Sequence, residues 1–264
     1  MRNALTLLLL LLGLVSAGYD RVVSLSPAIT ETVFALGRGD RLIARSSACD
    51  RPEEARELPI AGNFAQINVE KLLALNPDCV ISDTVIDLSR AEPLTRAGIR
   101  FEVLSCATLP EYAAALKRLG ELLDASEAAG REIAAVEAAM AEPRVADGPR
   151  VLWILWRSPV IAAGRGTLPD EALAIAGYRN AAAEKGYFKP APERLVSMEC
   201  DILIADGESG DPSGDPVLRF LKPVREGRVL LLPPGSRVER PGPGFLSGVA
   251  ELKELLAEIP REEP

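Results

Sequence analysis

The sequence predicts an α/β fold made of two lobes with a helical segment between them. Strand patterns alternate with helix patterns near both ends of the chain, and such alternation is typical of layers built on a mostly parallel sheet. The middle is rich in Ala, Glu and Leu and carries scarcely any strand signal. We therefore expect a cleaved leader at 1–17, an N-terminal lobe at 18–107, a helical spine at 108–143 and a C-terminal lobe at 144–264.

The N-terminal lobe opens on a short buried strand that leads straight into a helix. Ser26 and Pro27 are residue types that favour the cap and the first position of a helix, and Gly37 ends it. Asn68 is expected to cap a later helix, which Asn76-Pro77 breaks. The predicted strands are 21–25, 42–46, 79–82 and 100–104, and the predicted helices are 27–36, 69–75 and 89–97.

The spine carries two helix-start signals. Thr108-Leu-Pro-Glu111 is a capping box with an early proline, and it opens a helix to about Leu123. Asp124-Ala-Ser-Glu127 repeats the signal for a helix that runs to about Ala141. A long helix acts as a stiff spacer, so we expect this segment to hold the lobes at fixed spacing.

In the C-terminal lobe the alternation resumes. Thr167-Leu-Pro-Asp170 is expected to cap a helix that Gly177 ends. The other predicted elements are strands at 151–156, 202–205 and 229–232 and helices at 216–221 and 245–258.

The N-terminus has the features of a secretory signal. Arg2 is followed by a leucine-rich run over residues 4–14 and by the small residues Val15-Ser16-Ala17. This run is too short to span a bilayer, and a buried core helix is the other interpretation. We expect cleavage near Ala17 and, because no cysteine follows that position, no lipid anchor. No later segment is apolar for 18 residues, so no membrane insertion is expected.

Composition excludes several classes of function. The net charge of −8 is spread along the chain, which argues against nucleic acid as a partner. The absence of histidine removes Ser-His-Asp and Cys-His catalysis, His-rich zinc sites and His-ligated haem. The cysteines lack C-x-x-C spacing. Cys79 is expected to be a buried thiol, a Cys49–Cys106 bridge is conceivable, and the state of Cys200 is open.

A weak internal repeat relates the two lobes. Residues 64–83 and 187–206 align without a gap. Both contain, in order, an aromatic residue, a glutamate, a basic residue, an apolar helix stripe, an aspartate, a strand and a second aspartate. The two lobes therefore present equivalent elements, which suggests a pseudo-twofold relation across a cleft.

Two residue pairs in this repeat are candidates for function. Glu70 and Glu193 fall in the first turns of their helices, where dipole stabilisation of about 0.3–1 kcal/mol is a sufficient structural role. Phe64 and Tyr187 lie in the preceding loops, where they either staple the helices to the core or form walls of a cleft.

Four segments give the chain a resemblance to a known family. They are Val-Ser-Leu-Ser-Pro-Ala-Ile-Thr-Glu31, residues 70–81, Ala-Gly-Ile-Arg-Phe-Glu-Val-Leu104 and residues 193–204. The chain resembles the iron-siderophore/vitamin B12 group of periplasmic binding proteins. The resemblance implies two Rossmann-like α/β lobes joined by a single long rigid α-helix. It also implies a periplasmic monomer that delivers a metal chelate to an ABC permease dimer driven by a cytoplasmic ATPase.

The resemblance assigns roles to some residues. Glu70 and Glu193 match glutamates that meet arginines of the permease. Ala28 matches a contact in the floor of the cleft, and Arg240 matches an arginine that faces the ligand. No cofactor is implied apart from the cobalt or iron of the ligand itself.

The cleft departs from the family's pattern. Phe64 and Tyr187 stand where the vitamin B12 binding protein has stacking tryptophans, and Ala48 and Asp83 replace aromatics. Asp83 still counts as a candidate ligand contact. These changes leave cobalamin, another corrinoid and a ferric siderophore as ligands that fit equally.

Side chains in the strands and loops add to the candidates. Trp156, at the end of a predicted strand, is expected to line the cleft, whereas Trp153 is expected in the core. Arg45, Arg157 and Arg165 either neutralise an anionic chelate or are solvated at the surface.

Three other functions compete. For a secreted α/β enzyme, Gly164-Arg-Gly166 is only a fragment of a dinucleotide fingerprint, and Ser213 has no histidine to activate it. A haem-binding receptor of the same superfamily would need a tyrosine ligand from Tyr112, Tyr178 or Tyr187. A purely structural interaction domain would show no affinity for any chelate.

Overall fold

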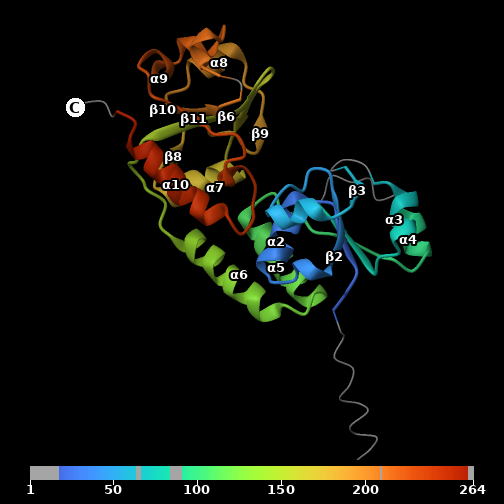
Figure 1. Cartoon of the computed structure of the whole chain (residues 1–264). Coiled ribbons are helices and arrows are strands. Elements are labelled where there is room, and N and C mark those ends of the chain that lie inside the picture. The colour runs from blue at the N-terminus through green and yellow to red at the C-terminus, as the bar shows by residue number, and fades with distance from the viewer. Residues whose placement is uncertain (1–17, 64–66, 84–90, 209, 261–264) are drawn as a thin grey trace, which may run out of the picture. The chain divides into compact units, whose positions relative to one another are not determined.

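A computed structural model describes residues 18–63, 67–83, 91–208 and 210–260. The chain divides into two compact units, each with its own sheet (Figure 1). The first unit is formed by Met1–Ser105 and Ala114–Ile133, and the second by Cys106–Ala113 and Ala134–Pro264. The predicted leader lies outside the described residues.

The first unit contains a five-stranded parallel sheet in the order β3-β2-β1-β4-β5. The four predicted strands are confirmed. The additional edge strand β3 was not predicted, because three residues, Ile-Ala-Gly, are too few to show a period. The strands are β1 (Val22–Ser24), β2 (Leu42–Ser46), β3 (Ile60–Gly62), β4 (Cys79–Ser82) and β5 (Arg100–Val103).

Helices cover both faces of this sheet: α3 and α4 lie on one side and α2 on the other (Figure 1). Strands β1 and β4 are therefore buried on both faces. The helices are α2 (Pro27–Ala35), α3 (Val69–Leu75) and α4 (Glu92–Arg96), with 3₁₀ turns η1 (Gly39–Arg41) and η2 (Glu53–Glu57). The start of the predicted helix at 89–97 falls on residues outside the description. The core between the sheet and α3 and α4 includes Val23, Leu25, Ala44, Leu72, Val80 and Leu94.

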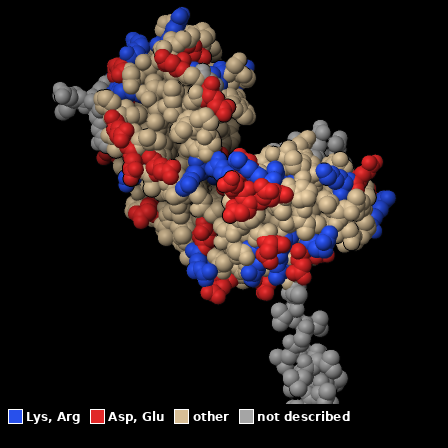
Figure 2. Space-filling view, viewed as in Figure 1, with Lys and Arg blue, Asp and Glu red and all other residues tan. Residues whose placement is uncertain are grey.

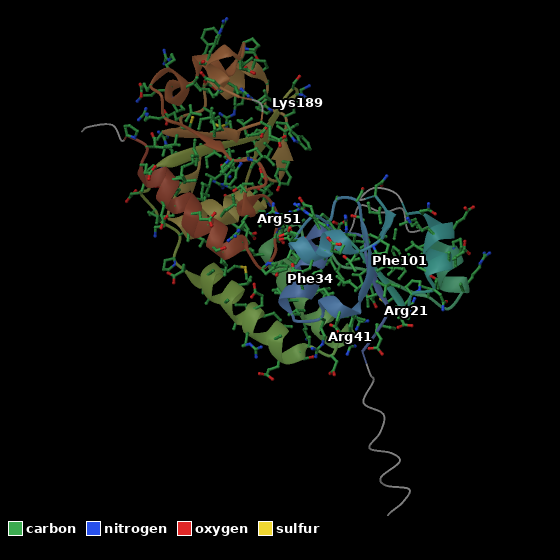
Figure 3. All side chains as sticks on the ribbon, viewed as in Figure 1. Arg21, Phe34, Arg41, Arg51, Phe101 and Lys189 are labelled. Carbon is green, nitrogen blue, oxygen red and sulfur yellow. The ribbon has the colours of Figure 1, made fainter. Side chains whose placement is uncertain are left out.

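Both ends of α3 are fixed by side chains. Asn68 caps the start as predicted, because its Oδ1 accepts the Lys71 N–H at 2.9 Å. At the other end the Arg21 guanidinium (Figure 3) donates to the carbonyls of Leu75 at 2.8 Å and Asn76 at 3.2 Å. Asn76 adopts φ 44°, which ends the helix. By contrast, Ser26 has the backbone of a cap before α2 but makes no side-chain cap bond.

The middle segment forms two helices, α5 (Leu109–Leu122) and α6 (Ser126–Ala141). The capping box opens α5, since Thr108 Oγ1 accepts the Glu111 N–H at 3.4 Å. Asp124 was predicted to cap α6, and that is wrong. It adopts φ 53° just after α5, and the Ala125 N–H donates to the Gly120 carbonyl at 2.8 Å, as in a Schellman-type ending.

Both middle helices contribute residues to both units, with the division falling after Ala113 in α5 and after Ile133 in α6. A single rigid helix between the lobes remains a prediction.

The second unit contains a sheet in the order β11-β10-β6-β7-β9, with β8 also paired to β6. The three predicted strands are confirmed and are mutually parallel. Strands β7, β8 and β9 were missed, and β7 and β9 add antiparallel pairs at one edge. The Ser158-Pro159 turn was the available signal for the β6–β7 hairpin. The strands are β6 (Arg150–Arg157), β7 (Val160–Ala163), β8 (Arg179–Asn180), β9 (Tyr187–Phe188), β10 (Ile202–Asp206) and β11 (Val229–Leu232).

Figure 1 shows α7 and α10 on one face of this sheet and α8 and α9 on the other. Thr167 caps α7 as predicted, and Gly177 ends it with φ 86°. The predicted helix at 216–221 is instead a 3₁₀ turn followed by a short helix that starts at Lys222-Pro223. The helices are α7 (Leu168–Ala176), α8 (Pro192–Val196), α9 (Lys222–Arg225) and α10 (Phe245–Ala257), with 3₁₀ turns η4 (Pro212–Gly214), η5 (Leu218–Phe220) and η6 (Arg237–Glu239).

The four cysteines are buried and none forms a disulfide, so the conceivable Cys49–Cys106 bridge is absent. Burial raises the pKa of the Cys79 thiol to about 12, and it does the same for Cys200. Both thiols therefore stay protonated and unreactive at neutral pH.

The surface in view in Figure 2 has acidic and basic side chains interspersed over both units. None of the helices in the described part of the chain combines the length and apolarity needed to cross a bilayer.

Candidate functional site

The first unit has a topological switch point between β1 and β4. From β1 the chain continues to β2 on one side of the sheet, and it later returns to β4 on the other side. In open α/β sheets, ligands bind in the crevice outside the carboxyl ends of strands that diverge in this way. The Leu25 N–H donates to the Ile81 carbonyl at 2.9 Å, which holds the two strand ends together. The predicted contacts Ala28 and Asp83 follow these ends, so the fold brings them to one edge.

Buried hydroxyl groups line this edge. Thr30 Oγ1 donates to Ser24 Oγ at 2.8 Å, and Ser24 Oγ donates to the Ser26 carbonyl at 3.2 Å. The hydroxyls of Ser26 and Ser82 are buried and have no partner among the described residues. Together with the start of α2, they make the edge polar although the strands themselves are apolar. Sequence reasoning missed Ser82, for which the available signal was a polar residue that ends an apolar strand run.

The predicted cleft aromatic of the second unit is Tyr187, on β9. It is 52% exposed. Burial of the phenol end raises its pKa, and the backbone N–H of Leu168 donates to that oxygen. The ring is therefore anchored at one end on the start of α7 and free along much of its face. Its repeat counterpart Phe64 lies outside the described residues.

Contacts with the segment before Tyr187 explain why positions 164 and 166 are glycines. Gly164 lies so close to the neighbouring chain that a Cβ there would be 2.2 Å from the Glu184 carbonyl oxygen. Its N–H donates to the Gly186 carbonyl at 2.9 Å. Gly166 adopts φ 74°. These glycines are required by close backbone approach and a turn, which is a sufficient reason for them without a nucleotide.

A second exposed aromatic lies on β6. Trp156 is 65% exposed, near the carboxyl end of the strand, whereas Trp153 is 3% exposed and belongs to the core as predicted. The register shifts between Ile154 and Trp156, and such a bulge re-aims the side chain that follows it. Trp156 thus offers a large flat apolar surface to solvent.

The candidate cations have different environments. Arg45 is buried and donates to the carbonyls of Ser46 at 3.0 Å and Arg56 at 3.1 Å, so the alternative that it is solvated at the surface is wrong. Its role toward an anionic chelate stays a prediction. Arg157 donates to the Gly210 carbonyl at 2.8 Å. Arg165 is exposed, and Arg240, which follows η6, is half-buried.

The two candidate docking glutamates have equivalent settings. Glu70 on α3 and Glu193 on α8 are both exposed. Neither carboxylate has a hydrogen bond or ion pair within the part of the chain that the structure describes. Leu72 and Leu195, two residues further along, are 0% and 1% exposed and attach the helices to their cores. Each unit therefore presents one unpaired negative charge on a short anchored helix.

A buried carboxylate organises the start of α7. Asp170 is 4% exposed. It accepts hydrogen bonds from the Gly166 N–H at 3.0 Å, from Asn180 Nδ2 at 3.2 Å and from Arg144 Nη1 at 3.4 Å. This network links α7 to the turn before it and to β8, and so supports the anchor of Tyr187.

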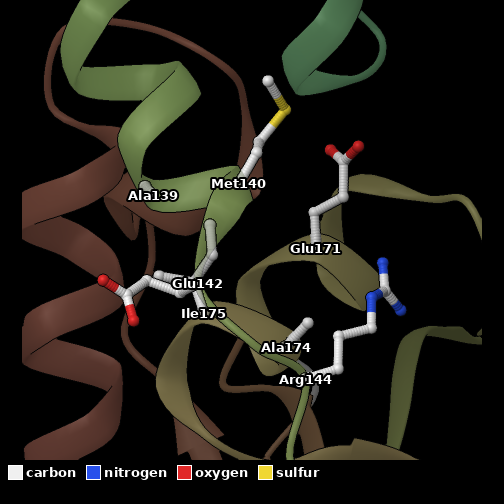
Figure 4. A pocket seen from close by; sticks show the side chains of 7 residues that line it. All are labelled: Ala139, Met140, Glu142, Arg144, Glu171, Ala174 and Ile175. Atoms are coloured by element: carbon white, nitrogen blue, oxygen red, sulfur yellow. The ribbon is translucent and has the colours of Figure 1, made fainter.

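Two cavities lie within the second unit, and neither is lined by a predicted ligand residue. One of about 230 Å³ lies between the end of α6 and α7 (Figure 4), where Met140, Arg144 and Glu171 line it. Burial raises the pKa of Glu171, which accepts the Leu109 N–H at 2.9 Å. The other, of about 440 Å³, includes Arg150, Arg179 and Arg228.

Comparison with known proteins adds to this geometry. Residues 22–234 match the family model described as periplasmic binding protein. The chain is 27% identical to the vitamin B12-binding protein of Vibrio parahaemolyticus over 252 residues, which cover 92% of this chain and 91% of that protein.

Two solved structures are similar over most of the chain. The periplasmic heme-binding protein RhuT from Roseiflexus sp. RS-1 in apo form has a TM-score of 0.75 and 25% identity, with 90% of this chain and 98% of that chain covered. The periplasmic vitamin B12 binding protein BtuF of Vibrio cholerae has a TM-score of 0.72 and 24% identity, with 90% and 97% covered.

Proposed function

Because this chain belongs to the periplasmic binding protein family, we propose that it captures a metal chelate between its lobes and delivers it to an ABC importer. The observation that carries the proposal is a pair of exposed aromatic side chains, Trp156 and Tyr187, on β6 and β9. Flat rings give large apolar contact at low entropic cost, which suits the apolar parts of a corrin or a siderophore. The polar edge near Ala28 and Asp83 in the first unit would supply further contacts to the ligand.

A corrinoid or a ferric siderophore is the ligand class that we favour. The name of the Vibrio parahaemolyticus relative supports cobalamin. The departures at Ala48 and Asp83 support a smaller or more polar chelate. Arg165 and Arg240 would meet its acidic groups.

A haem ligand is the second candidate, favoured by the likeness to the heme-binding protein from Roseiflexus. Of the three tyrosines considered as haem ligands, Tyr112 and Tyr178 are 1% and 7% exposed, which leaves Tyr187. Ligation by tyrosine needs the phenolate, so an iron–oxygen bond to Tyr187 would form with release of the phenol proton.

An enzymatic role is not favoured. Ser213 Oγ donates to Asp211 Oδ2 at 2.6 Å, and this bond lowers the pKa of Asp211. A carboxylate with a lowered pKa is a poor general base. The pair caps a 3₁₀ turn, which is a sufficient structural role. We infer capture and release of the ligand without turnover.

Delivery would depend on Glu70 and Glu193. An unpaired carboxylate on each unit can meet an arginine of each permease subunit, and such charge-assisted contacts fix orientation. A cytoplasmic ATPase would then drive transport. We also propose that residues 1–17 direct secretion, so that the mature protein is a free periplasmic monomer.

Ligand capture is tested by titrating the purified protein with cyanocobalamin, hemin and a ferric trihydroxamate while tryptophan emission is recorded. Trp156 is exposed and should be quenched by the ligand that binds, and Trp156→Phe should remove most of the quench. Trp153→Phe is the matched control on the same strand. The absence of saturable quenching and calorimetric heat with all three chelates would refute the ligand class.

Docking is tested separately. Glu70→Ala combined with Glu193→Ala should leave chelate affinity unchanged while import into the host is lost. If this double variant supports normal import, the docking assignment is wrong.

A further inference from the structure

Two exposed aliphatic side chains occupy equivalent places in the two units. Leu73 on α3 is 39% exposed, and Val196 on α8 is 43% exposed. A single exposed aliphatic residue is ordinary on a protein surface. Here the two belong to the same position of the internal repeat, since each lies three residues after its glutamate, Glu70 or Glu193.

The three-residue spacing puts each pair on one side of its helix. Residues at i and i+3 are neighbours on a helical surface. The intervening Leu72 and Leu195 are buried, so they fix which side of each helix faces the solvent. Ala74 and Ser197, at i+4, are also exposed and small. Each helix thus presents an exposed carboxylate beside an exposed aliphatic side chain, and the neighbouring residue at i+4 is too small to cover either of them.

Neither glutamate carboxylate on these two surfaces is paired locally. Glu70 and Glu193 have no ion-pair partner among the described residues. Arg194, the basic residue that follows Glu193, forms an ion pair with Glu184 instead, since its Nε lies 3.3 Å from Glu184 Oε1. A surface that satisfies both groups must supply a cation next to an apolar recess.

We propose that Leu73 and Val196 are apolar docking contacts, and that the partner is a dimeric membrane permease with two matching surfaces, each cationic and apolar. This inference rests on the proposed docking role of Glu70 and Glu193. The pair of a glutamate and an aliphatic residue occurs once in each unit. We infer a dimeric partner because two equal surfaces on one chain fit two copies of one receptor subunit. The glutamates set orientation by charge, and the aliphatic side chains add affinity that salt does not screen.

The expected effect follows from the exposed fraction of each side chain. Docking can bury at most the exposed part of each side chain, which is 39% for Leu73 and 43% for Val196, so the loss is a fraction of that for a whole leucine or valine. Replacement by serine should therefore weaken docking about 3- to 8-fold per site, and about 10- to 60-fold for Leu73→Ser with Val196→Ser.

The test measures binding of fluorescently labelled full-length mature protein to spheroplasts of the host, as saturable signal displaced by unlabelled protein, at 50 and 500 mM NaCl. The aliphatic pair should lose a similar factor at both salt concentrations, whereas the factor lost by Glu70→Ala with Glu193→Ala should shrink at high salt. Leu255→Ser with Val145→Ser is the matched control, because these side chains are 36% and 42% exposed elsewhere. Control binding should stay within twofold of the wild type.

The outcomes distinguish the docking role of the glutamates from that of the aliphatic side chains. If the glutamate pair weakens binding but the aliphatic pair behaves like the control, the inference fails and the docking role of the glutamates stands. If neither pair weakens binding, or if no saturable binding occurs, the docking role fails and the inference fails with it. Urea midpoints of all variants check folding, and Leu73→Gln with Val196→Gln replaces the serine pair if that pair unfolds.

Discussion

Asp170 is the residue whose loss should most disturb the second unit without touching a ligand. It is 4% exposed and accepts three hydrogen bonds at the start of α7. Asp170→Ala leaves the Gly166 N–H without its acceptor and removes one of two acceptors of Asn180 Nδ2, which also donates to the Ala163 carbonyl at 3.2 Å. These two bonds tie α7 to the turn before it and to Asn180 on β8.

The magnitude follows from the partners. A hydrogen bond to a charged acceptor contributes about 1.5–3 kcal/mol. We count two of the three bonds in full, those donated by Gly166 and Asn180. The third donor, Arg144, has a side chain that is 66% exposed, so its contribution is small. Relief of the buried charge offsets part of the loss, so we expect unfolding free energy to fall by about 3 kcal/mol. Asp170→Asn keeps one acceptor oxygen and should lose about 1–2 kcal/mol.

Urea unfolding followed by tryptophan emission measures this loss. Both tryptophans of the chain lie on β6, so emission reports on the unit that contains Asp170. With a urea m-value of about 2 kcal/mol/M, the midpoint should fall by about 1.5 M. The exposed Asp147→Ala in the same unit is the control and should leave the midpoint in place. A midpoint for Asp170→Ala that matches this control would show that the buried carboxylate does not stabilise the unit.

Two further predictions concern backbone approach and buried thiols. Gly164→Ala would place a Cβ 2.2 Å from the Glu184 carbonyl oxygen, so we expect the free energy of unfolding to fall by more than about 2 kcal/mol. The ligand should also quench tryptophan emission less, because Tyr187 would be displaced. An unchanged urea midpoint would contradict this prediction. The pKa of Cys79 and of Cys200 is raised from 9.0 to about 12. Above pH 9 the unfolded thiols lose protons that the folded thiols keep, so stability should fall between pH 9 and 12 by up to about 4 kcal/mol per thiol. Cys79→Ala with Cys200→Ala should flatten this slope, and an equal slope in both proteins would count against buried thiols as its cause.

Local signals predicted much of the fold. Asn68, Thr167 and Gly177 act as the predicted caps and stop, because a cap depends on atoms within four residues. The signal at Asp124 was equally local but ambiguous. An acidic residue that tolerates a left-handed backbone can end one helix as well as begin the next, and only the Ala125-to-Gly120 hydrogen bond distinguishes the two.

Long-range contacts decided what local signals could not. Strands β7 and β9 join the sheet by antiparallel pairing, and β9, with two residues, has no pattern of its own. Arg45 is indistinguishable in sequence from a surface arginine, yet its guanidinium is buried against the Arg56 carbonyl. For the site, the repeat predicted the settings of Glu70 and Glu193, but the anchor of Tyr187 on Leu168 appears only when β9 meets α7.

Periodicity, caps and an internal repeat were enough to predict two α/β lobes, the succession of their central strands and helices along the chain, and a glutamate in the first turn of an equivalent helix in each lobe. Which polar groups are buried and hydrogen-bonded, and which stay exposed at the surface, could be seen only in the folded structure. The physical reason is that burial and pairing depend on atoms brought together from distant parts of the chain, such as Gly164 and Glu184 or Glu171 and Leu109.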